Sequence, residues 1–97
     1  MQIVKHPRFK EFFFDIKDKW TKAKLLAKIS SLAAGNPGNN RHVGEGVQEL
    51  KVDYGPGWRI YYVRVGEEVV MLLAGGTKNR QQQDIETAKT LARELKR

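Results

Sequence analysis

The chain contains no cysteine, and this absence removes disulfides, thiolate nucleophiles and most zinc sites. Its two histidines, His6 and His42, lie far apart without a carboxylate at metal-ligand spacing, so we expect neither a metal nor a two-histidine mechanism. No apolar run approaches the ~20 residues that cross a bilayer, and the first residues lead directly into a charged segment. We therefore expect a cytoplasmic protein without signal peptide, membrane segment or cofactor.

Positive charge is the feature that the sequence has in excess. The 97 residues include 18 lysines and arginines against 11 acidic residues, a net charge of +7, and their length predicts a single domain over residues 1–97. The surplus is concentrated in residues 5–28, which carry Lys5, Arg8, Lys10, Lys17, Lys19, Lys22, Lys24 and Lys28. Such a domain attracts polyanions, of which nucleic acid is the commonest. A solvated helix face, an acidic protein segment and anionic lipid remain open as alternatives.

Hydrophobic periodicity predicts a small α+β domain. Residues 1–4 read as a short strand, residues 7–20 as a helix begun by Pro7, and residues 22–34 as a second helix capped by Thr21. Phe9, Phe12, Phe13, Ile16 and Trp20 are predicted to face the core, whereas Phe14 is expected either to contact a partner or to close the hydrophobic edge. A loop over 35–40 is followed by strands at 47–54, 58–65 and 68–74 and a helix at 81–96. We predict two N-terminal helices and a C-terminal helix packed on a small antiparallel sheet.

The most informative segment runs from Glu49 to Tyr62. Alternation of apolar and polar residues predicts one strand before the Gly55-Pro56-Gly57 turn and another after it. Period-2 geometry puts Arg59 and Tyr61 on one face, and Trp58, Ile60 and Tyr62 on the face toward the helices. An arginine beside a lysine-bearing neighbour strand suits a phosphate. Tyr61 is a candidate to stack on a base or relay a proton, or is an exposed strand tyrosine without chemistry.

Three motifs together resemble the RelE/HigB toxin superfamily, the addiction-module killer proteins. They are Val43-Gly-Glu-Gly-Val47 with Leu50-Lys-Val-Asp-Tyr-Gly-Pro-Gly-Trp-Arg-Ile-Tyr-Tyr62, then Leu72-Leu-Ala-Gly-Gly-Thr-Lys78, and then Asp84-Ile85. The resemblance implies the toxin of a type II toxin–antitoxin pair that enters the ribosome, cleaves mRNA and inhibits translation. It also implies a small antitoxin partner, often a helix-turn-helix protein.

The resemblance also implies roles for single residues. Arg59 aligns with the arginine that stabilises the scissile phosphate, and Lys51 with a lysine that stabilises charge or acts as general base. Lys78 and Tyr61 are further catalytic candidates. Asp84 is a candidate for the general acid, or else complements the helix dipole. RNA-binding candidates are Lys22, Lys24, Lys28 and Arg80.

Two other functions stay open on the sequence. The closing helix lacks the tyrosine that RelE carries there, and the second RelE arginine has only Lys78 and Arg80 nearby. A ParE-like toxin that acts on DNA gyrase would not need Arg59 and Lys51 to converge on a phosphate. A non-catalytic nucleic-acid-binding module would bind with strong salt dependence and without cleavage.

Overall fold

The computed structural model describes residues 1–96. Along that range the chain forms β1 (Gln2–Lys5), α1 (Pro7–Asp15), α2 (Lys19–Ala33), β2 (Asn40–Gly44), β3 (Val47–Val52), β4 (Trp58–Gly66), β5 (Val69–Gly76), the short 3₁₀ helix η1 (Lys78–Arg80) and α3 (Gln81–Leu95). None of the helices in this range is long and apolar enough to cross a membrane.

The strands form one sheet in the order β1-β5-β4-β3-β2. Neighbouring strands are antiparallel except β1, which pairs in parallel with β5 from Gln2–Val69 to Lys5–Leu72. The predicted α+β architecture is confirmed, but the sheet is mixed at this edge. Strand β2 was not predicted, because Asn40–Gly44 is a polar edge strand with no apolar alternation.

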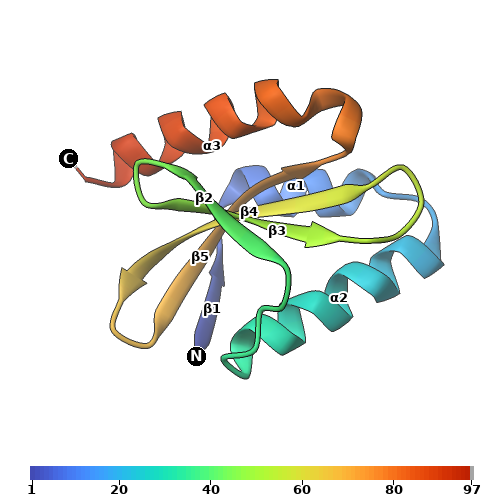
Figure 1. Ribbon diagram of the computed structural model, residues 1–97, viewed down its shortest axis with the longest axis horizontal. Helices are drawn as coiled ribbons and strands as arrows, with labels where there is room; N and C mark the ends of the chain where they lie inside the picture. The colour runs from blue at the N-terminus through green and yellow to red at the C-terminus, as the bar shows by residue number, and fades with distance from the viewer. Residues whose placement is uncertain (97) are drawn as a thin grey trace.

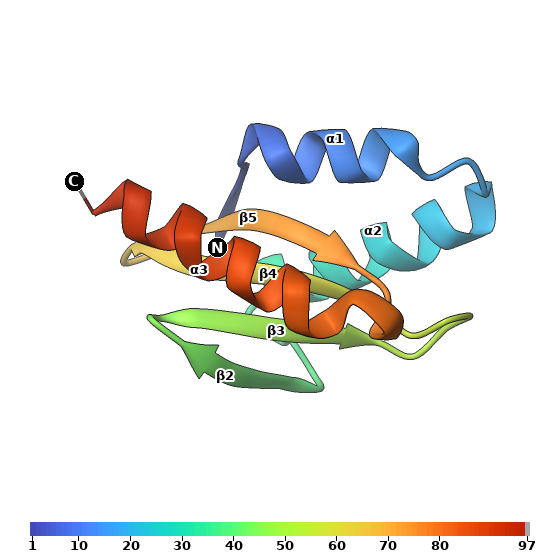
Figure 2. The same ribbon diagram turned by 90° about the horizontal axis from the view of Figure 1, so that it is seen from above.

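Helices cover both faces of the sheet, as Figures 1 and 2 show: α1 and α2 lie on one side and α3 on the other. The first core joins α1 and α2 to Leu50, Ile60 and Tyr62. The second core lies under α3, where Ala88 and Ala92 contact the opposite side of the sheet. The predicted orientation of Ile60 and Tyr62 toward the first helices is confirmed, and odd-numbered residues of β4 face α3.

The boundary between the first two helices differs from the prediction. Helix α1 ends at Asp15, and α2 begins at Lys19 because Asp18, not Thr21, is its N-cap. The Asp18 carboxylate accepts hydrogen bonds from the backbone N–H groups of Trp20 and Thr21 at 3.3 and 3.2 Å. This break changes the helical register, so Trp20 is 64% exposed and the prediction that it belongs to the core was wrong.

Candidate functional site

A polar hollow of about 330 Å³ opens at the edge of the sheet where β2, β3 and β4 meet the start of α3. It is lined by Asn39, Asn40, Arg41, Glu49, Lys51, Arg59 and Gln81. The lining therefore has three cationic side chains and one carboxylate. Residues 1–96 contain no group of three histidine, aspartate or glutamate side chains arranged to hold a metal. The donors in the hollow suit an anion.

Arg59 is the least expected member of this set, because its side chain is buried and only 6% of the residue is exposed. Its Nη1 donates a hydrogen bond of 2.6 Å to the carbonyl oxygen of Gly57, and its Nε has no partner. Among residues 1–96 no carboxylate lies within ion-pair distance of it. Gly57 must be glycine, since its φ is +83° and a Cβ would lie 2.6 Å from Nη1.

Lys51 lies directly opposite Arg59 in the β3–β4 pairing. The side chain is partly exposed and lines the hollow. Glu49 and Asp53 flank Lys51 on its own strand segment, yet Lys51 makes no ion pair with either in the described part of the chain. Two adjacent strands therefore present a lysine and an arginine to one volume, as the sequence predicted.

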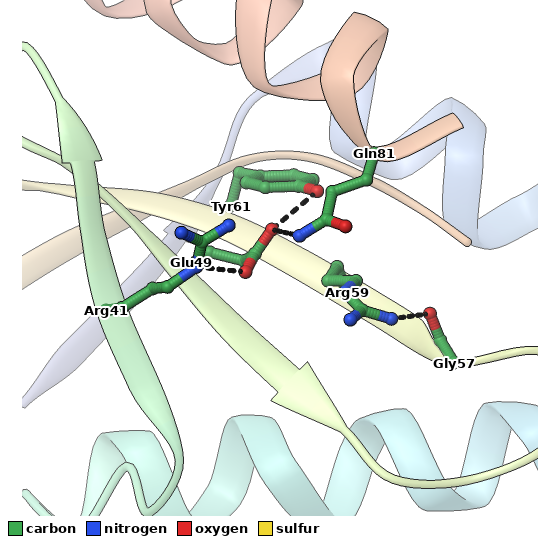
Figure 3. A network of polar contacts seen from close by, with 6 residues as sticks. All are labelled: Arg41, Glu49, Gly57, Arg59, Tyr61 and Gln81. Carbon is green, nitrogen blue, oxygen red and sulfur yellow. Dashed lines mark hydrogen bonds and ion pairs between the residues drawn. The ribbon is translucent and has the colours of Figure 1, made fainter. Parts of the chain in front are cut away.

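Glu49, for which the sequence predicted no role, organises the other end of the hollow (Figure 3). Arg41 Nε donates to its Oε1 at 2.9 Å, while Tyr61 Oη and Gln81 Nε2 donate to its Oε2 at 3.1 and 2.8 Å. Burial by itself would raise the pKa of Glu49, but hydrogen bonds from Arg41, Gln81 and Tyr61 outweigh burial and lower the pKa. Glu49 is thus an ionised buried carboxylate that joins β2, β4 and α3.

Tyr61 does not lie on an exposed face. It is completely buried beneath α3, and its hydroxyl donates to Glu49. Burial, followed by the negative charge of Glu49 and the hydrogen bond to it, raises the pKa of Tyr61 well above its usual value. The prediction that Tyr61 stacks on a base or relays a proton is therefore corrected. Helix α3 covers the strand face that was expected to be open, and Tyr61 instead holds the Glu49 carboxylate by a hydrogen bond.

The remaining catalytic candidates lie beside the hollow and do not line it. Asp84, in the first turn of α3, rests on Gly76, where a Cβ would lie 2.8 Å from the Asp84 Cγ. Its Oδ2 is buried without a partner, and burial raises the pKa of Asp84. Arg80 Nε lies 4.0 Å from Asp84 Oδ1. Lys78 is exposed at the Gly57 turn, with its Cβ 3.4 Å from the position of a Gly57 Cβ.

The three lysines predicted to bind RNA from the second helix lie on α2, which packs on the opposite face of the sheet from α3. None of them lines the hollow. Lys22 Nζ lies 5.1 Å from the centre of the Phe13 ring and Lys24 Nζ 5.5 Å from that of Tyr54. Any RNA contact made by these lysines is therefore made on a separate surface.

The chain is similar to known proteins over most of its length. A family model described as "Phage derived protein Gp49-like" matches residues 12–96. An uncharacterized protein of Haemophilus influenzae is 39% identical over 95 residues, which cover 98% of this chain and 96% of that protein.

A solved structure shares the fold. In the crystal structure of the intact E. coli RelBE toxin–antitoxin complex, one chain matches with a TM-score of 0.64 and 16% identity, covering 78% of this chain and 94% of that chain. The resemblance inferred from the sequence motifs is confirmed by the family match and by this fold. The chain belongs to the Gp49-like family of phage-derived proteins, a family of the RelE/HigB toxin type.

Proposed function

We propose that this protein is the toxin of a type II toxin–antitoxin pair and inhibits translation by cutting ribosome-bound mRNA without a metal. The observation that carries this proposal is the Arg59 guanidinium, buried with a free Nε and no carboxylate partner in residues 1–96. A buried charge without a counter-charge is unfavourable by several kcal/mol. A phosphate in the hollow supplies the missing negative charge and accepts hydrogen bonds in a forked geometry that only arginine offers.

In the proposed reaction the 2′-hydroxyl oxygen of the RNA attacks the adjacent phosphorus, and the bond to the 5′-oxygen breaks. The 2′-hydroxyl loses a proton, the 5′-oxygen gains one, and negative charge builds up on the phosphoryl oxygens between these events. Arg59 and Lys51, side by side on β4 and β3, stabilise that charge. Arg41, held by Glu49, adds a third cation at the far end of the hollow.

We assign the candidates beside the hollow to supporting steps. Asp84 has a raised pKa, which favours the protonated carboxyl that a general acid requires. Lys78 extends the cationic surface along the Gly57 turn toward the next phosphate of the message. The lysines of α2 and Arg80 contact the backbone of ribosomal RNA.

The proposed partner is a cognate antitoxin, because the chain shares its fold with a protein of a toxin–antitoxin complex. We propose an antitoxin of the helix-turn-helix type that neutralises this toxin and represses transcription of the pair. An acidic surface on that antitoxin would complement the net charge of +7.

Primer extension on a message translated by purified ribosomes tests the proposed reaction. We expect new 5′ ends within the reading frame that require ribosomes and disappear with Arg59→Ala. Arg64→Ala is the matched control, since Arg64 lies on the same strand, is exposed and does not line the hollow. Cleavage that survives Arg59→Ala would remove this site from the proposal.

Two other outcomes would indicate a different function. Growth arrest with intact message and broken DNA would indicate a ParE-like action on gyrase. Salt-dependent RNA binding without cleavage would indicate a non-catalytic binding module.

A further inference from the structure

A second depression, away from the catalytic hollow, lies between α1 and α2. Its volume is about 230 Å³, and it is lined by Lys5, Phe9, Lys10, Phe13, Phe14, Lys22, Leu26 and Ile29. We call it the α1–α2 groove. Phe14 is 73% exposed and Leu26 49%, although both are large apolar residues. Apolar side chains thus border the groove from both helices, where a folded monomer usually places polar ones.

The charged side chains that line this groove have one sign. Its lining includes three lysines and no carboxylate, and none of these lysines makes an ion pair within residues 1–96. Two more lysines lie between α1 and the first turn of α2, with Lys17 Nζ 5.5 Å from the centre of the Phe14 ring and Lys19 Nζ 5.8 Å from that of Trp20. Asp15 and Asp18 stand beside them in the sequence. The groove therefore combines an apolar floor with a lining that contains lysines and no carboxylate.

These features discriminate between possible occupants. The groove is smaller than the ~300–1,000 Å³ of typical small-molecule sites. A second copy of this chain would bring another basic rim against the first, which like-charge repulsion opposes. Single-stranded RNA binds by stacking bases on open ring faces, but ammonium groups already lie over the rings of Phe13, Phe14 and Trp20.

We infer that the α1–α2 groove receives an amphipathic helix of a partner protein, with apolar side chains on the groove floor and flanking aspartates and glutamates on the lysine rim. Helices dock in this manner through apolar residues at positions i, i+3, i+4 and i+7. The inference rests on the proposed function, in which the partner is the antitoxin. It adds that the antitoxin binds outside the hollow and inhibits by covering Lys22, one of the lysines assigned to ribosomal RNA.

The test is selection of binding peptides from a displayed random library on the immobilised full-length protein. We expect enriched peptides with apolar residues at helical spacing flanked by acidic residues. Their affinity for Leu26→Glu and for Phe14→Glu should fall at least about tenfold, because each change puts a negative charge on the apolar contact. Leu95→Glu is the matched control: Leu95 is similarly exposed, on α3 at the other face, and should leave binding unchanged.

Ribosome-dependent cleavage by Leu26→Glu separates this inference from the proposed function. We expect the wild-type rate of cleavage at saturating ribosomes together with lost peptide binding. Peptides without acidic residues, peptides that bind Leu26→Glu as tightly as wild type, or no enrichment would overturn the inference even where cleavage is observed. Loss of RNA-oligonucleotide binding in Leu26→Glu and Phe14→Glu with peptide binding retained would also overturn it and assign the groove to RNA. Absence of cleavage by the wild-type protein would instead count against the proposed function.

Discussion

A buried arginine at position 59 lowers the stability of the folded protein relative to an apolar residue there. Burying leucine or methionine at this position of the sheet would require less free energy than burying a guanidinium, whose Nε has no partner. What the structure provides is orientation: the Gly57 carbonyl holds Nη1, and the residue lies mid-sheet between Lys51 and Gly76. A donor fixed before its ligand arrives does not have to reorganise during the reaction. The fold therefore loses some stability at Arg59 and gains a guanidinium that is oriented before its ligand binds.

Replacing Arg59 by methionine should separate stability from activity. We expect Arg59→Met to abolish cleavage and to raise the free energy of unfolding by about 1–2 kcal/mol, because a buried unpaired charge is replaced by an apolar chain of similar length. Urea denaturation and primer extension measure the two quantities. Arg64→Met, on an exposed part of the same strand, should change stability by less than ~0.5 kcal/mol. A marked loss of stability in Arg59→Met would mean that the folded protein already neutralises this charge.

Glu49 should make stability depend on pH. Its pKa is lowered in the folded protein, so its ionised form stabilises the fold above the ordinary value of 4.5, and this contribution disappears as the pH falls through the folded pKa. We expect Glu49→Gln to be less stable than wild type by about 1–3 kcal/mol at pH 7, since an amide cannot accept from Arg41, Gln81 and Tyr61 together. The difference should shrink under acid conditions. Urea denaturation at several pH values measures it, with the exposed Glu94→Gln as control.

The sequence predicted which way the site residues point better than how deeply they lie. Period-2 alternation and a fixed turn put Lys51, Arg59 and Tyr61 on one strand face, and the pairing confirms this placement. Tyr61 was expected at the surface because nothing in its local sequence reveals that Ala88 and Ala92 of α3 cover it. Glu49 was missed for the same reason: burial of a carboxylate depends on donors from three separate elements.

Two consecutive glycines at the end of β5 bring helices close to both faces of the sheet. Successive strand residues face opposite sides, so a Cβ on Gly75 would lie 2.6 Å from Phe12 Cζ of α1, and one on Gly76 would meet the Asp84 carboxyl of α3. The same helix start positions Gln81 against Glu49. The Gly75-Gly76 pair therefore sets the distance of α1 and α3 from the sheet.

Alanine at either glycine should push a helix away. We expect Gly75→Ala and Gly76→Ala each to lower the free energy of unfolding by about 1–3 kcal/mol through overpacking. Gly76→Ala should also reduce cleavage, because moving the start of α3 withdraws Gln81 from Glu49. Thermal or urea denaturation and primer extension measure these effects. Gly66→Ala is the control, since its Cβ would lie 3.4 Å from Val69, close to ordinary contact. Unchanged stability in both variants would show that the helices yield without cost.

The elements best predicted from sequence were those with a strong period and a defined turn. Strands β3, β4 and β5 combine apolar alternation with glycine turns, and all three were placed within a few residues. The α1–α2 boundary was misplaced because Thr21 and Asp18 are both good caps, and only the fold decides that Asp18 accepts the N–H groups of α2. Strand β2 forms because it pairs with β3, with a register shift between His42 and Gly44. The residues of β2 show no apolar alternation from which a strand could be predicted.

The net charge of +7 is divided between surfaces that the sequence cannot separate. Three cations line the hollow at the β2–β4 edge, whereas the lysines of α2 lie across the sheet. Composition predicts attraction to a polyanion as a whole. Only the fold assigns Arg59 and Lys51 to one volume and Lys24 and Lys28 to another. The proposed message cleavage and the proposed ribosome attachment therefore rest on separate surfaces of one small domain.

This separation predicts opposite kinetic consequences for two sets of lysines. Replacing Lys24 and Lys28 by glutamine should raise the ribosome concentration required for half-maximal cleavage and reduce the slope of log affinity against log salt by about 1 per lysine. The rate at saturating ribosomes should stay near wild type, because neither residue lines the hollow. Lys51→Gln should instead lower the rate at saturation by ~10- to 100-fold, the effect of losing a donor that stabilises the transition state. Cleavage kinetics over a range of ribosome and salt concentrations measure both. An equal fall in the saturating rate for both variants would show that the α2 lysines act on the same RNA segment as Lys51.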